Sequence, residues 1–600
     1  MIGIDLGTTN SVVSFLEAGR PVVIPNEEGS NTTPSVVFFR GGDEIIVGEL
    51  AKRQMVSNPS HTISSAKRFM GRRINEISDT VKQVHYQLAD DPENDRILID
   101  LEWKKISPEE VSAEILKKMR KSAEIFLDEI INQAVVTVPA YFNDSQRSAT
   151  KKAAEMAGLE VMRIVNEPTA AALAYGLNRE GNETIAVFDF GGGTFDVSIL
   201  ELSDNMFEVR STNGDTFLGG ENIDHIIFNL IKDEIKEQTG IEINQFPQAV
   251  QRACEAAEKA KCELSSMNVT TISLPFLVSD DSGPKHYNRE ITRQEFEGLI
   301  TPVIERLLPP CRMALMDAGL SPSHLDAVIM VGGSTRIPKV IETAADFFGK
   351  DPVTGINPDE VVAMGAAVQA GVITGQIEEV LLLDITPLSL GIELADDLFS
   401  VIIPRNSSVP TTAFKKFTTV KDNQKNVYIH VLQGERKRAS QNRSLSHFRL
   451  TDITPAPKEV PEIEVKFTVD ANGILNVSAT DMTSGESREV RIESYHAAIP
   501  SDYEEDLKKA EESEEEDRAY IERVRRHDRA RKVEEVMRKF LHEQRKNIPE
   551  NELAELMEIV DSLSEATDKN NFEAMEQWER TLLSLAENHR KIFKKYKSVL

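Results

Sequence analysis

Two spacings of hydrophobic residues alternate along the chain up to about residue 375. Short β-branched runs such as AVVTVPA and TIAVFDF alternate with segments of helical period such as VSAEILKKMRKSAEIFLDEIINQ. Strand and helix patterns that alternate in this way are typical of an α/β architecture. We therefore predict an α/β domain over residues 1–377.

The hydrophobic pattern changes to a period of two after Val380. VLLLDITPLSLGI leads into the alternating runs KNVYIHV and IEVKFTVDANGILNVSA. Within the second run, Asn472-Gly473 predicts a two-residue hairpin turn, because this dipeptide readily adopts positive φ. The pattern predicts a β domain over residues 387–497, joined to the α/β domain by a linker at 378–386.

Strand signals stop at about Ser501, and a region rich in Lys, Arg and Glu continues to Leu600. Apolar residues recur there at helical spacing, at Leu507 and Ala510, Tyr520 and Val524, and Val536 and Phe540. We predict a helical region over residues 498–600 and interpret the acidic run from Glu511 to Asp517 as a solvated face.

Composition narrows the class of protein. A chain of 600 residues is expected to form roughly four structural units. The net charge of −29 argues against nucleic acid or an anionic membrane as the main partner. Three cysteines, no basic leader and no apolar stretch of membrane-spanning length predict a cytoplasmic protein.

One internal repeat indicates a nucleotide site. IGIDLGTTNSVVSF is echoed by AVFDFGGGTFDVSIL, each with a strand, an Asp, a Gly-containing turn and a second strand. A tandem duplication would place two such hairpins face to face across a cleft, where phosphates could be held from both sides. We therefore expect duplicated halves within the α/β domain.

The residues of the repeat suit polyphosphate. Glycine-rich turns let backbone N–H groups approach phosphate closely, and the candidate turns are Gly7-Thr8-Thr9 and Gly191-Gly192-Gly193-Thr194. Carboxylates at the mouths of these turns would repel phosphate, and a hydrated Mg²⁺ resolves the conflict; they are Asp5, Asp189 and Asp196. Neither a Walker A nor a dinucleotide-binding G-x-G-x-x-G pattern is present.

A third glycine cluster follows a strand in VIMVGGSTRIPKV, where the spacing of Arg336 suits a guanidinium plane behind a purine ring. Further on, the small residues of VVAMGAAVQAG predict a closely packed helix. That helix suits either a hinge between lobes or simple tight packing.

Seven motifs in order give the chain a family resemblance. They are DLGTTNS, NEPTAAALAYG, DFGGGTFD, TNGDTFLGGE, VGGSTR, VLLLD and HVLQGERKRA. Together they resemble the seventy-kilodalton heat-shock chaperones of the bacterial DnaK type, over residues 1–495 and more loosely in the helical tail. The resemblance implies an actin-like ATPase domain, a β-sandwich peptide-binding domain and an α-helical lid, in which ATP hydrolysis slows the exchange of extended hydrophobic segments of unfolded polypeptides.

The resemblance also implies the nucleotide-site residues. Catalytic roles fall on Lys67, Glu167, Thr194 and Asp196, and Mg²⁺ is held mostly through water by Asp5, Glu167 and Asp189, with K⁺ as a further candidate cation. The implied ATP or ADP contacts are Gly7, Thr8, Thr9, Asn10, Gly191, Gly192, Gly193, Glu258, Lys261, Ser265, Gly333, Ser334, Arg336 and Asp359.

Coupling and peptide binding are implied in the same way. Pro139, Arg147, Arg163, Asn166 and Asp384 match positions that link hydrolysis to the linker and to a J-domain co-chaperone; a nucleotide exchange factor is a further implied partner. Apolar Val380 to Leu383 would pair with the ATPase lobe in the ATP state. Ile392, Phe417, Val427 and Ile429 match a pocket for one peptide side chain, although core positions of the sandwich would look the same.

The chain departs from the family pattern at two places. Ala395 and Val420 align with the residues that arch over the peptide, so the enclosure is expected to be looser. The lid latch aligns with Lys458 and Arg531, two cations that cannot form a salt bridge, and Asp528 is a possible substitute.

Two other functions fit parts of the sequence. A sugar or polyol kinase could share the actin-like fold, but the VLLLD linker and residues 385–600 count against it. An exchange factor or holdase relative would bind ATP without useful turnover, and the presence of Lys67, Thr194 and Asp196 disfavours it.

Overall fold

The computed structural model describes residues 1–41, 44–74, 77, 84–91, 96–177, 179, 181–203, 206–280, 283–377, 380–471, 473–491 and 514–587. The chain divides into two compact units. The first comprises Met1–Glu393, Val401–Glu435 and Asn442–Asp506, and the second Leu394–Ser400, Arg436–Gln441 and Leu507–Leu600. The predicted boundary at 497 lies outside the described residues, and those at 377 and 386 stay predictions. No described helix is long and apolar enough to cross a membrane.

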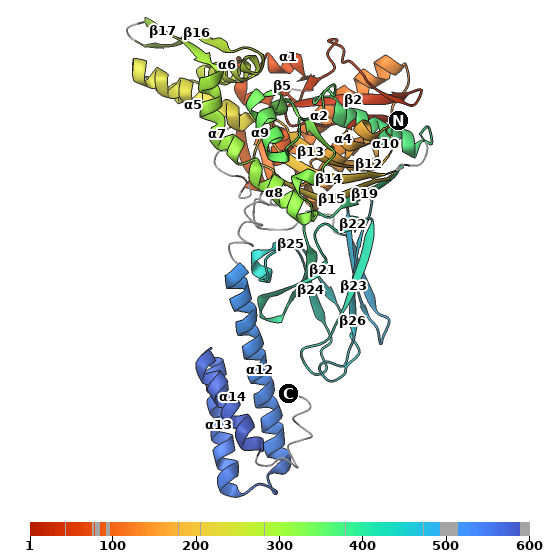
Figure 1. Cartoon of the computed structure of the whole chain (residues 1–600), viewed down its shortest axis with the longest axis vertical. Helices are drawn as coiled ribbons and strands as arrows, with labels where there is room; N and C mark the ends of the chain where they lie inside the picture. The colour runs from red at the N-terminus through yellow and green to blue at the C-terminus, as the bar shows by residue number, and fades with distance from the viewer. Residues whose placement is uncertain are drawn as a thin grey trace. The chain divides into compact units, whose positions relative to one another are not determined.

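Two large sheets of the first unit share one plan, as the internal repeat predicts (Figure 1). In each, a hairpin pairs through its first strand with a parallel strand from later in the chain. The first sheet runs β12 (Glu160–Asn166), β11 (Gln133–Val138), β1 (Ile2–Asp5), β2 (Asn10–Glu17) and β3 (Arg20–Val23), with β4 (Thr33–Pro34) beside β2. The second runs β18 (Ala327–Val331), β13 (Glu183–Phe190), β14 (Phe195–Ser203), β15 (Met206–Asp215), β19 (Leu381–Ile385) and β22 (Ser408–Val409).

The rest of the described α/β region contains helices and three smaller sheets. The helices are α1 (Glu49–Lys52), α2 (Pro108–Leu127), α3 (Asp144–Met156), α4 (Glu167–Gly176), α5 (Gly220–Thr239), α6 (Pro247–Ser266), α7 (Arg293–Glu305), α8 (Leu308–Asp317), α9 (Pro338–Phe348) and α10 (Val361–Ile373). The smaller sheets are β5 (Val37–Gly41) with β6 (Glu44–Val47) and β7 (Thr62–Ile63), β8 (Gln87–Asp91) with β9 (Arg96–Asp100) and β10 (Lys105–Ile106), and β16 (Val269–Asp280) with β17 (Gly283–Thr292).

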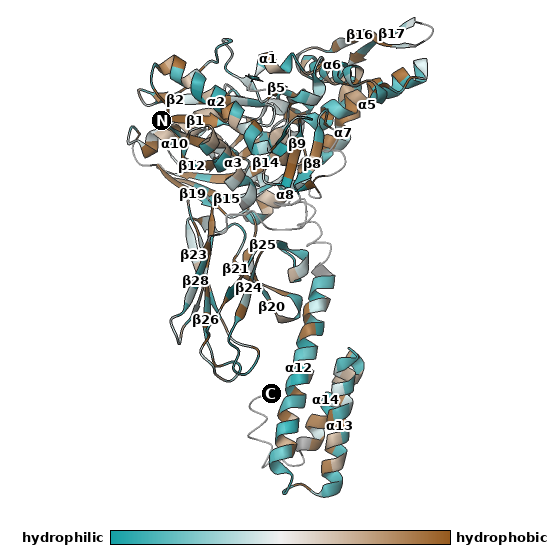
Figure 2. Ribbon diagram, turned by 180° about the vertical axis from the view of Figure 1, so that it is seen from behind, coloured by the Kyte–Doolittle hydropathy of each residue, from teal (hydrophilic) through white to brown (hydrophobic). Residues whose placement is uncertain are grey.

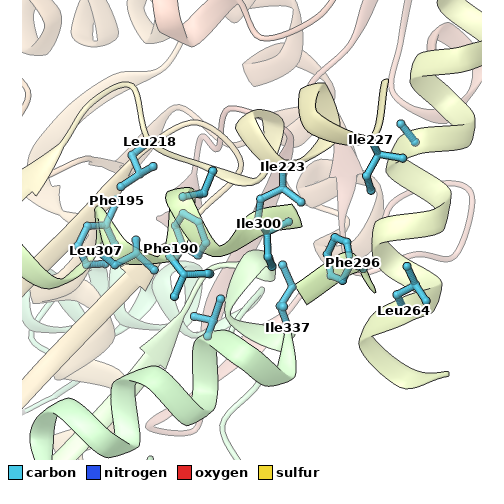
Figure 3. Close-up of a cluster of buried hydrophobic side chains, with 14 of the residues drawn as sticks. Phe190, Phe195, Leu218, Ile223, Ile227, Leu264, Phe296, Ile300, Leu307 and Ile337 are labelled. Carbon is cyan, nitrogen blue, oxygen red and sulfur yellow. The ribbon is translucent and has the colours of Figure 1, made fainter. Parts of the chain in front are cut away.

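Buried side chains from both kinds of element form the core beneath the second hairpin. Phe190 and Phe195, at the two ends of the hairpin turn, belong to one cluster with Ile223 of α5, Leu264 of α6 and Phe296 of α7 (Figure 3). Because the strands that carry the turn are anchored in this cluster, its backbone is held in a defined position.

Helix α10 packs against α4 and β1 at van der Waals distance. A Cβ atom on Gly365 would lie 1.7 Å from the carbonyl oxygen of Ala170 in α4, and one on Gly3 would lie 2.3 Å from the backbone nitrogen of Ala367. The small residues of α10 therefore serve tight packing, one of the two interpretations that the sequence allowed.

Gly365→Ala is expected to lower the free energy of unfolding of the α/β region by about 1–3 kcal/mol, because the added methyl group forces two helix backbones apart. Gly298→Ala is the matched control, since no heavy atom lies within 4 Å of its added Cβ in α7. That control is expected to be neutral or stabilising by up to about 1 kcal/mol. Thermal unfolding of the two variants measures the difference, and equal midpoints would contradict the packing argument.

The period-2 region forms two four-stranded sheets, as expected of a β-sandwich. One contains β21 (Leu398–Ile403), β20 (Leu390–Leu394), β24 (Val427–Gln433) and β25 (Arg443–Leu450), and the other β23 (Thr411–Phe417), β26 (Ile463–Val469), β27 (Leu475–Asp481) and β28 (Ser487–Arg491). Residues of both sheets share one buried hydrophobic cluster.

The predicted two-residue turn in this region is wrong. The backbone N–H of Asp470 donates to the carbonyl of Ile474, so three residues separate the paired positions. Gly473 has the expected positive φ of 79°, while Asn472 lies outside the described residues. The Asp470 carboxylate also accepts the Ile474 N–H at 2.9 Å, which stabilises the longer loop.

The described part of the second unit contains the helices α12 (Glu514–Gln544), α13 (Glu550–Asp568) and α14 (Phe572–Glu587), as the helical spacing predicts. Hydrophobic residues alternate with hydrophilic ones along all three (Figure 2). Their buried residues, including Val533, Phe540, Leu556 and Leu563, form one cluster.

The interpretation of the acidic run as a solvated face is wrong for Asp517. This residue of α12 is buried and accepts two hydrogen bonds from the Arg436 guanidinium, at 3.1 and 3.2 Å, and one from the Lys437 N–H. Tyr520, one turn later, donates to the carbonyl of Asp396. The start of α12 is therefore bound by polar contacts to the two short segments of its own unit.

Candidate functional site

The two glycine turns face each other. A Cβ atom on Gly192 would lie 2.0 Å from Oγ1 of Thr9, and one on Gly193 would lie 2.9 Å from Cγ2 of Thr8. Each turn is tight: a Cβ on Gly7 would lie 2.0 Å from the carbonyl of Asn10, and the Gly191 N–H donates to the Thr194 carbonyl at 3.0 Å. The duplicated hairpins thus bring backbone N–H groups together from both sides, as the repeat predicts.

Acidic side chains and one lysine gather behind the turns. Asp5 ends β1, Asp189 and Asp196 pair with each other across the β13–β14 hairpin, and Glu167 begins α4. The Lys67 ammonium group donates to Oε1 of Glu167 at 2.7 Å, and the Lys67 side chain is 5% exposed. A buried cation is therefore held directly beside the carboxylates.

Burial and mutual repulsion disfavour negative charge in this cluster. Burial, and then the Glu167 charge, raise the pKa of Asp5 to about 7. The same two causes raise the pKa values of Asp189 and Asp196 well above the usual range. Oδ2 of Asp196 is buried and has no hydrogen-bond partner among the described residues.

Hydrated Mg²⁺ fits these residues. The donors are hard carboxylate oxygens, and a dication would offset their repulsion. Among the described residues, no three His, Cys, Asp or Glu side chains converge closely enough to bind a metal directly. That arrangement suits an ion that keeps most of its water ligands and meets the carboxylates through them.

The third glycine cluster adjoins the second turn. Oγ of Ser334 donates to the Gly191 carbonyl at 2.8 Å, and Gly332 has a φ of 82° where it passes the backbone of Phe190. A Cβ on Gly220, at the start of α5, would lie 2.5 Å from Oγ of Ser334 and 3.2 Å from Nζ of Lys261. The structure therefore brings this third cluster to the same site.

Most of the other residues predicted to contact ATP or ADP lie near the third glycine cluster, either on α6 or at Arg336 and Asp359. On α6, Glu258 accepts from Lys52 at 2.9 Å, Lys261 pairs with Asp224 at 2.7 Å, and Ser265 donates to the Lys261 carbonyl. Beyond the third cluster, Arg336 pairs with Asp359 at 2.6 Å, and Asp359 lies next to Gly333. Asn10 is exposed at the start of β2.

A cavity of about 600 Å³ opens between these elements, and its lining includes Thr8, Thr9, Gly192, Glu258 and Lys261. This volume is in the range of small-molecule sites.

The same cavity is also lined by three residues that the sequence analysis did not predict, Ser65, Arg68 and Glu221. Glu221 of α5 accepts from Ser65 at 2.6 Å and pairs with Arg68 at 3.0 Å, and Arg68 also donates to the Gly193 carbonyl. Arg68 directly follows Lys67, and Glu221 directly follows the two glycines of TNGDTFLGGE. Their positions next to residues of the predicted site could have identified them as candidates.

Four of the predicted coupling residues lie in one hydrogen-bonded region. Arg147 donates to Oδ1 of Asn166 at 2.5 Å and to the carbonyls of Ala140 and Phe142, while the Phe142 N–H donates to the Pro139 carbonyl. Nδ2 of Asn166 donates to Oδ2 of Asp384 at 2.8 Å. Arg163, the fifth, lies on β12 within electrostatic reach of Asp384. A continuous set of contacts therefore runs from Pro139 to the linker.

The linker is a strand of the second sheet, so its pairing with the α/β region is observed, while the dependence of that pairing on ATP stays a prediction. Residues Leu381 to Leu383 of β19 pair in parallel with Met206 to Glu208 of β15. Leu382 is 4% exposed, whereas Leu381 is 51% exposed. Asp384 and Ile385 continue into an antiparallel pairing with β22 of the β region.

The four residues predicted to form the peptide pocket lie in the β-sandwich, whereas Ala395 belongs to the second unit. Ile392 and Ile429 are buried in its core, and Phe417 and Val427 are half-buried against it. Val420 is 65% exposed, and Ala395 is exposed in the short helix at Ala395–Asp397. Lys458 belongs to the first unit, whereas Arg531 and Asp528 belong to the second.

Comparison with protein families agrees with this geometry. A family model described as Hsp70 protein matches residues 1–598. The chain therefore belongs to the Hsp70 family of ATP-dependent chaperones, which combine an actin-like ATPase, a substrate-binding region and a helical lid, and which bind ATP or ADP with Mg²⁺.

Proposed function

We propose that ATP binding and hydrolysis switch the β-sandwich between fast and slow exchange of extended hydrophobic peptide segments, in a chaperone of the bacterial DnaK type. The observation that carries this proposal is the pairing of β19 with β15, because it makes the linker part of the nucleotide-binding sheet. A ligand that changes the stability of this pairing changes the state of the domain beyond it.

Hydrolysis is assigned to the groups behind the two turns. Lys67 interacts with the γ-phosphate and the attacking water, Asp196 orients that water or accepts its proton, and the Thr194 hydroxyl binds the γ-phosphate. Asp5, Glu167 and Asp189 would hold Mg²⁺ through water, and the ion would supply positive charge against the phosphates. The facing backbone N–H groups supply the remaining positive potential, which is the main requirement of phosphoryl transfer.

Loss of the γ-phosphate is proposed to reach the linker through the hydrogen bonds that join Pro139, Arg147, Asn166 and Asp384. Arg163, Asn166 and Asp384 are proposed as the contacts of a J-domain co-chaperone that stimulates hydrolysis. An exchange factor would then promote ADP release from the cleft around Glu258 and Lys261.

Peptide specificity is assigned to the β-sandwich. Ile392, Phe417, Val427 and Ile429 would accept one leucine-like side chain, and backbone hydrogen bonds would hold the extended peptide. Ala395 and Val420 would cover it more loosely than in the usual family pattern, and Lys458 and Arg531 would not latch the lid.

The test is the dissociation rate of a fluorescently labelled apolar heptapeptide from the full chain. We expect ATP to accelerate release relative to ADP, because the closed state is reached only after hydrolysis. A heptapeptide of the same length with Asp in place of the central Leu is the control for specific binding. Equal release rates in ATP and ADP would reject the coupling.

A further inference from the structure

Two histidines lie directly opposite each other on neighbouring strands of the β-sandwich. His430 of β24 pairs with His447 of β25 in the antiparallel register, and their ring centroids are 4.0 Å apart with planes inclined by 25°. On the other side of β24, Nδ1 of His430 donates to Oε2 of Glu393 at 2.6 Å, at the end of β20. A row of three polar side chains therefore crosses three adjacent strands.

This row lies on the face of the sheet away from the core. Ile392 and Ile429, which precede Glu393 and His430 in the sequence, are buried in the sandwich. Successive side chains of a strand point to opposite faces, so Glu393 and His430 point away from the core. His430 is half-buried and His447 is exposed. None of the three residues has a part in the nucleotide or peptide site described above.

Both imidazoles approach one hydroxyl group. Oγ of Ser444 lies 2.8 Å from Nε2 of His430 and 3.3 Å from Nε2 of His447. A hydroxyl has one proton and can donate to only one of these nitrogens. Because the Nδ1–H of neutral His430 is directed to Glu393, its Nε2 carries the lone pair that points toward Ser444.

We propose that these residues form a binding site for a zinc-class divalent ion, with Nε2 of His430 and Nε2 of His447 as ligands. Zn²⁺ accepts imidazole nitrogens in a tetrahedral arrangement, and a carboxylate bonded to the far nitrogen is typical of a metal-ligating histidine. Glu393 occupies that orienting position. The exposed His447 ring can turn about χ2 to direct its lone pair at the ion.

Water or the Ser444 hydroxyl would complete the coordination. In the described part of the chain no three His, Cys, Asp or Glu side chains already converge as metal ligands, so this is a two-imidazole site. Imidazole favours Zn²⁺, Cu²⁺ and Ni²⁺ over Mg²⁺, which prefers oxygen ligands. The site is therefore distinct in chemistry from the nucleotide site.

An ion bound by this row of side chains would link neighbouring strands of the sheet. It would join β20, β24 and β25, and the segment that follows Glu393, Leu394–Ser400, belongs to the helical unit. Ion binding would thus stabilise the strand that leads directly into that unit.

Zn²⁺ titration of the metal-stripped full chain by calorimetry tests the site. We expect His447→Gln to weaken binding at one site by at least about tenfold, and Glu393→Ala to weaken it by about tenfold through loss of the hydrogen bond that orients His430. His324→Gln removes an exposed histidine elsewhere and is the matched control, expected to bind as wild type does. Zn²⁺ should also raise the thermal midpoint of the β region in wild type but not in His447→Gln.

Anomalous diffraction at the zinc edge locates the ion independently. A peak within bonding distance of Nε2 of His430 and Nε2 of His447, at the edge of the two rings, is expected. Unchanged affinity in His447→Gln, or an equal loss in His324→Gln that indicates adventitious binding to surface histidines, would overturn the proposal. Unchanged affinity in Glu393→Ala would overturn the orienting role.

Discussion

Lys67→Ala is expected to lower the rate of ATP hydrolysis by at least about 10²-fold, because it removes a preorganised charge from the transition state. Nζ of Lys67 is held at 2.7 Å from Glu167 and is almost fully buried, so its charge is fixed beside the carboxylates. The facing glycine turns remain, and the variant should still bind ADP. Single-turnover hydrolysis with excess enzyme separates the chemical step from nucleotide binding.

The control for this variant is Lys117→Ala, which removes a half-exposed lysine from α2 together with its surface ion pair to Glu114. Such pairs contribute about 0–1 kcal/mol, so hydrolysis should be unchanged. Undiminished turnover in Lys67→Ala would remove this lysine from the catalytic site. A parallel measurement of ADP affinity shows whether the site still folds.

The second large effect is expected in the linker, where Leu382→Asp should abolish the acceleration of peptide release by ATP. Leu382 is 4% exposed in β19, and an unpaired carboxylate at a buried position disfavours the paired strand by roughly 3 kcal/mol or more. Since each 1.4 kcal/mol is about tenfold, the paired state would lose at least about 10²-fold in population. Peptide release with ATP should then be as slow as with ADP.

Leu381→Asp is a control at the next position of the same strand. Leu381 is 51% exposed, so the carboxylate stays in water and ATP should still accelerate release. If both variants, or neither, lost the response to ATP, burial of the linker strand would not explain the coupling. ATP hydrolysis by each variant confirms that the nucleotide site is intact.

Local patterns predicted the two glycine turns and their meeting face to face because each turn is formed by residues close together in sequence. DLGTT and DFGGGT each contain the strand end, the carboxylate and the glycines that approach phosphate. Their repetition also predicted two similar sheets, and β1–β2 and β13–β14 occupy equivalent places in them.

Contacts between distant residues could not be predicted in this way. Ser65 and Glu221 are 156 positions apart, and Arg436 and Asp517 are 81 apart. A single charged or polar residue gives no periodic signal, so Asp517 within an acidic run resembled a solvated side chain although it is buried in an ion pair.

The hairpin turn at Gly473 shows a similar limit on a smaller scale. The dipeptide Asn472-Gly473 predicted positive φ, which Gly473 has. The number of residues in the loop depends instead on the register in which the two strands pair. The carboxylate of Asp470 and its pairing with Ile474 set that register, and neither contact is encoded in the alternation of polar and apolar residues.

The most direct test of the account is a crystal structure of the full chain with Mg²⁺ and a non-hydrolysable ATP analogue. The account predicts triphosphate between Gly7–Thr9 and Gly191–Thr194, with the γ-phosphate beside Lys67 and the base between α6 and Arg336. Triphosphate bound at any other place in the chain would contradict it.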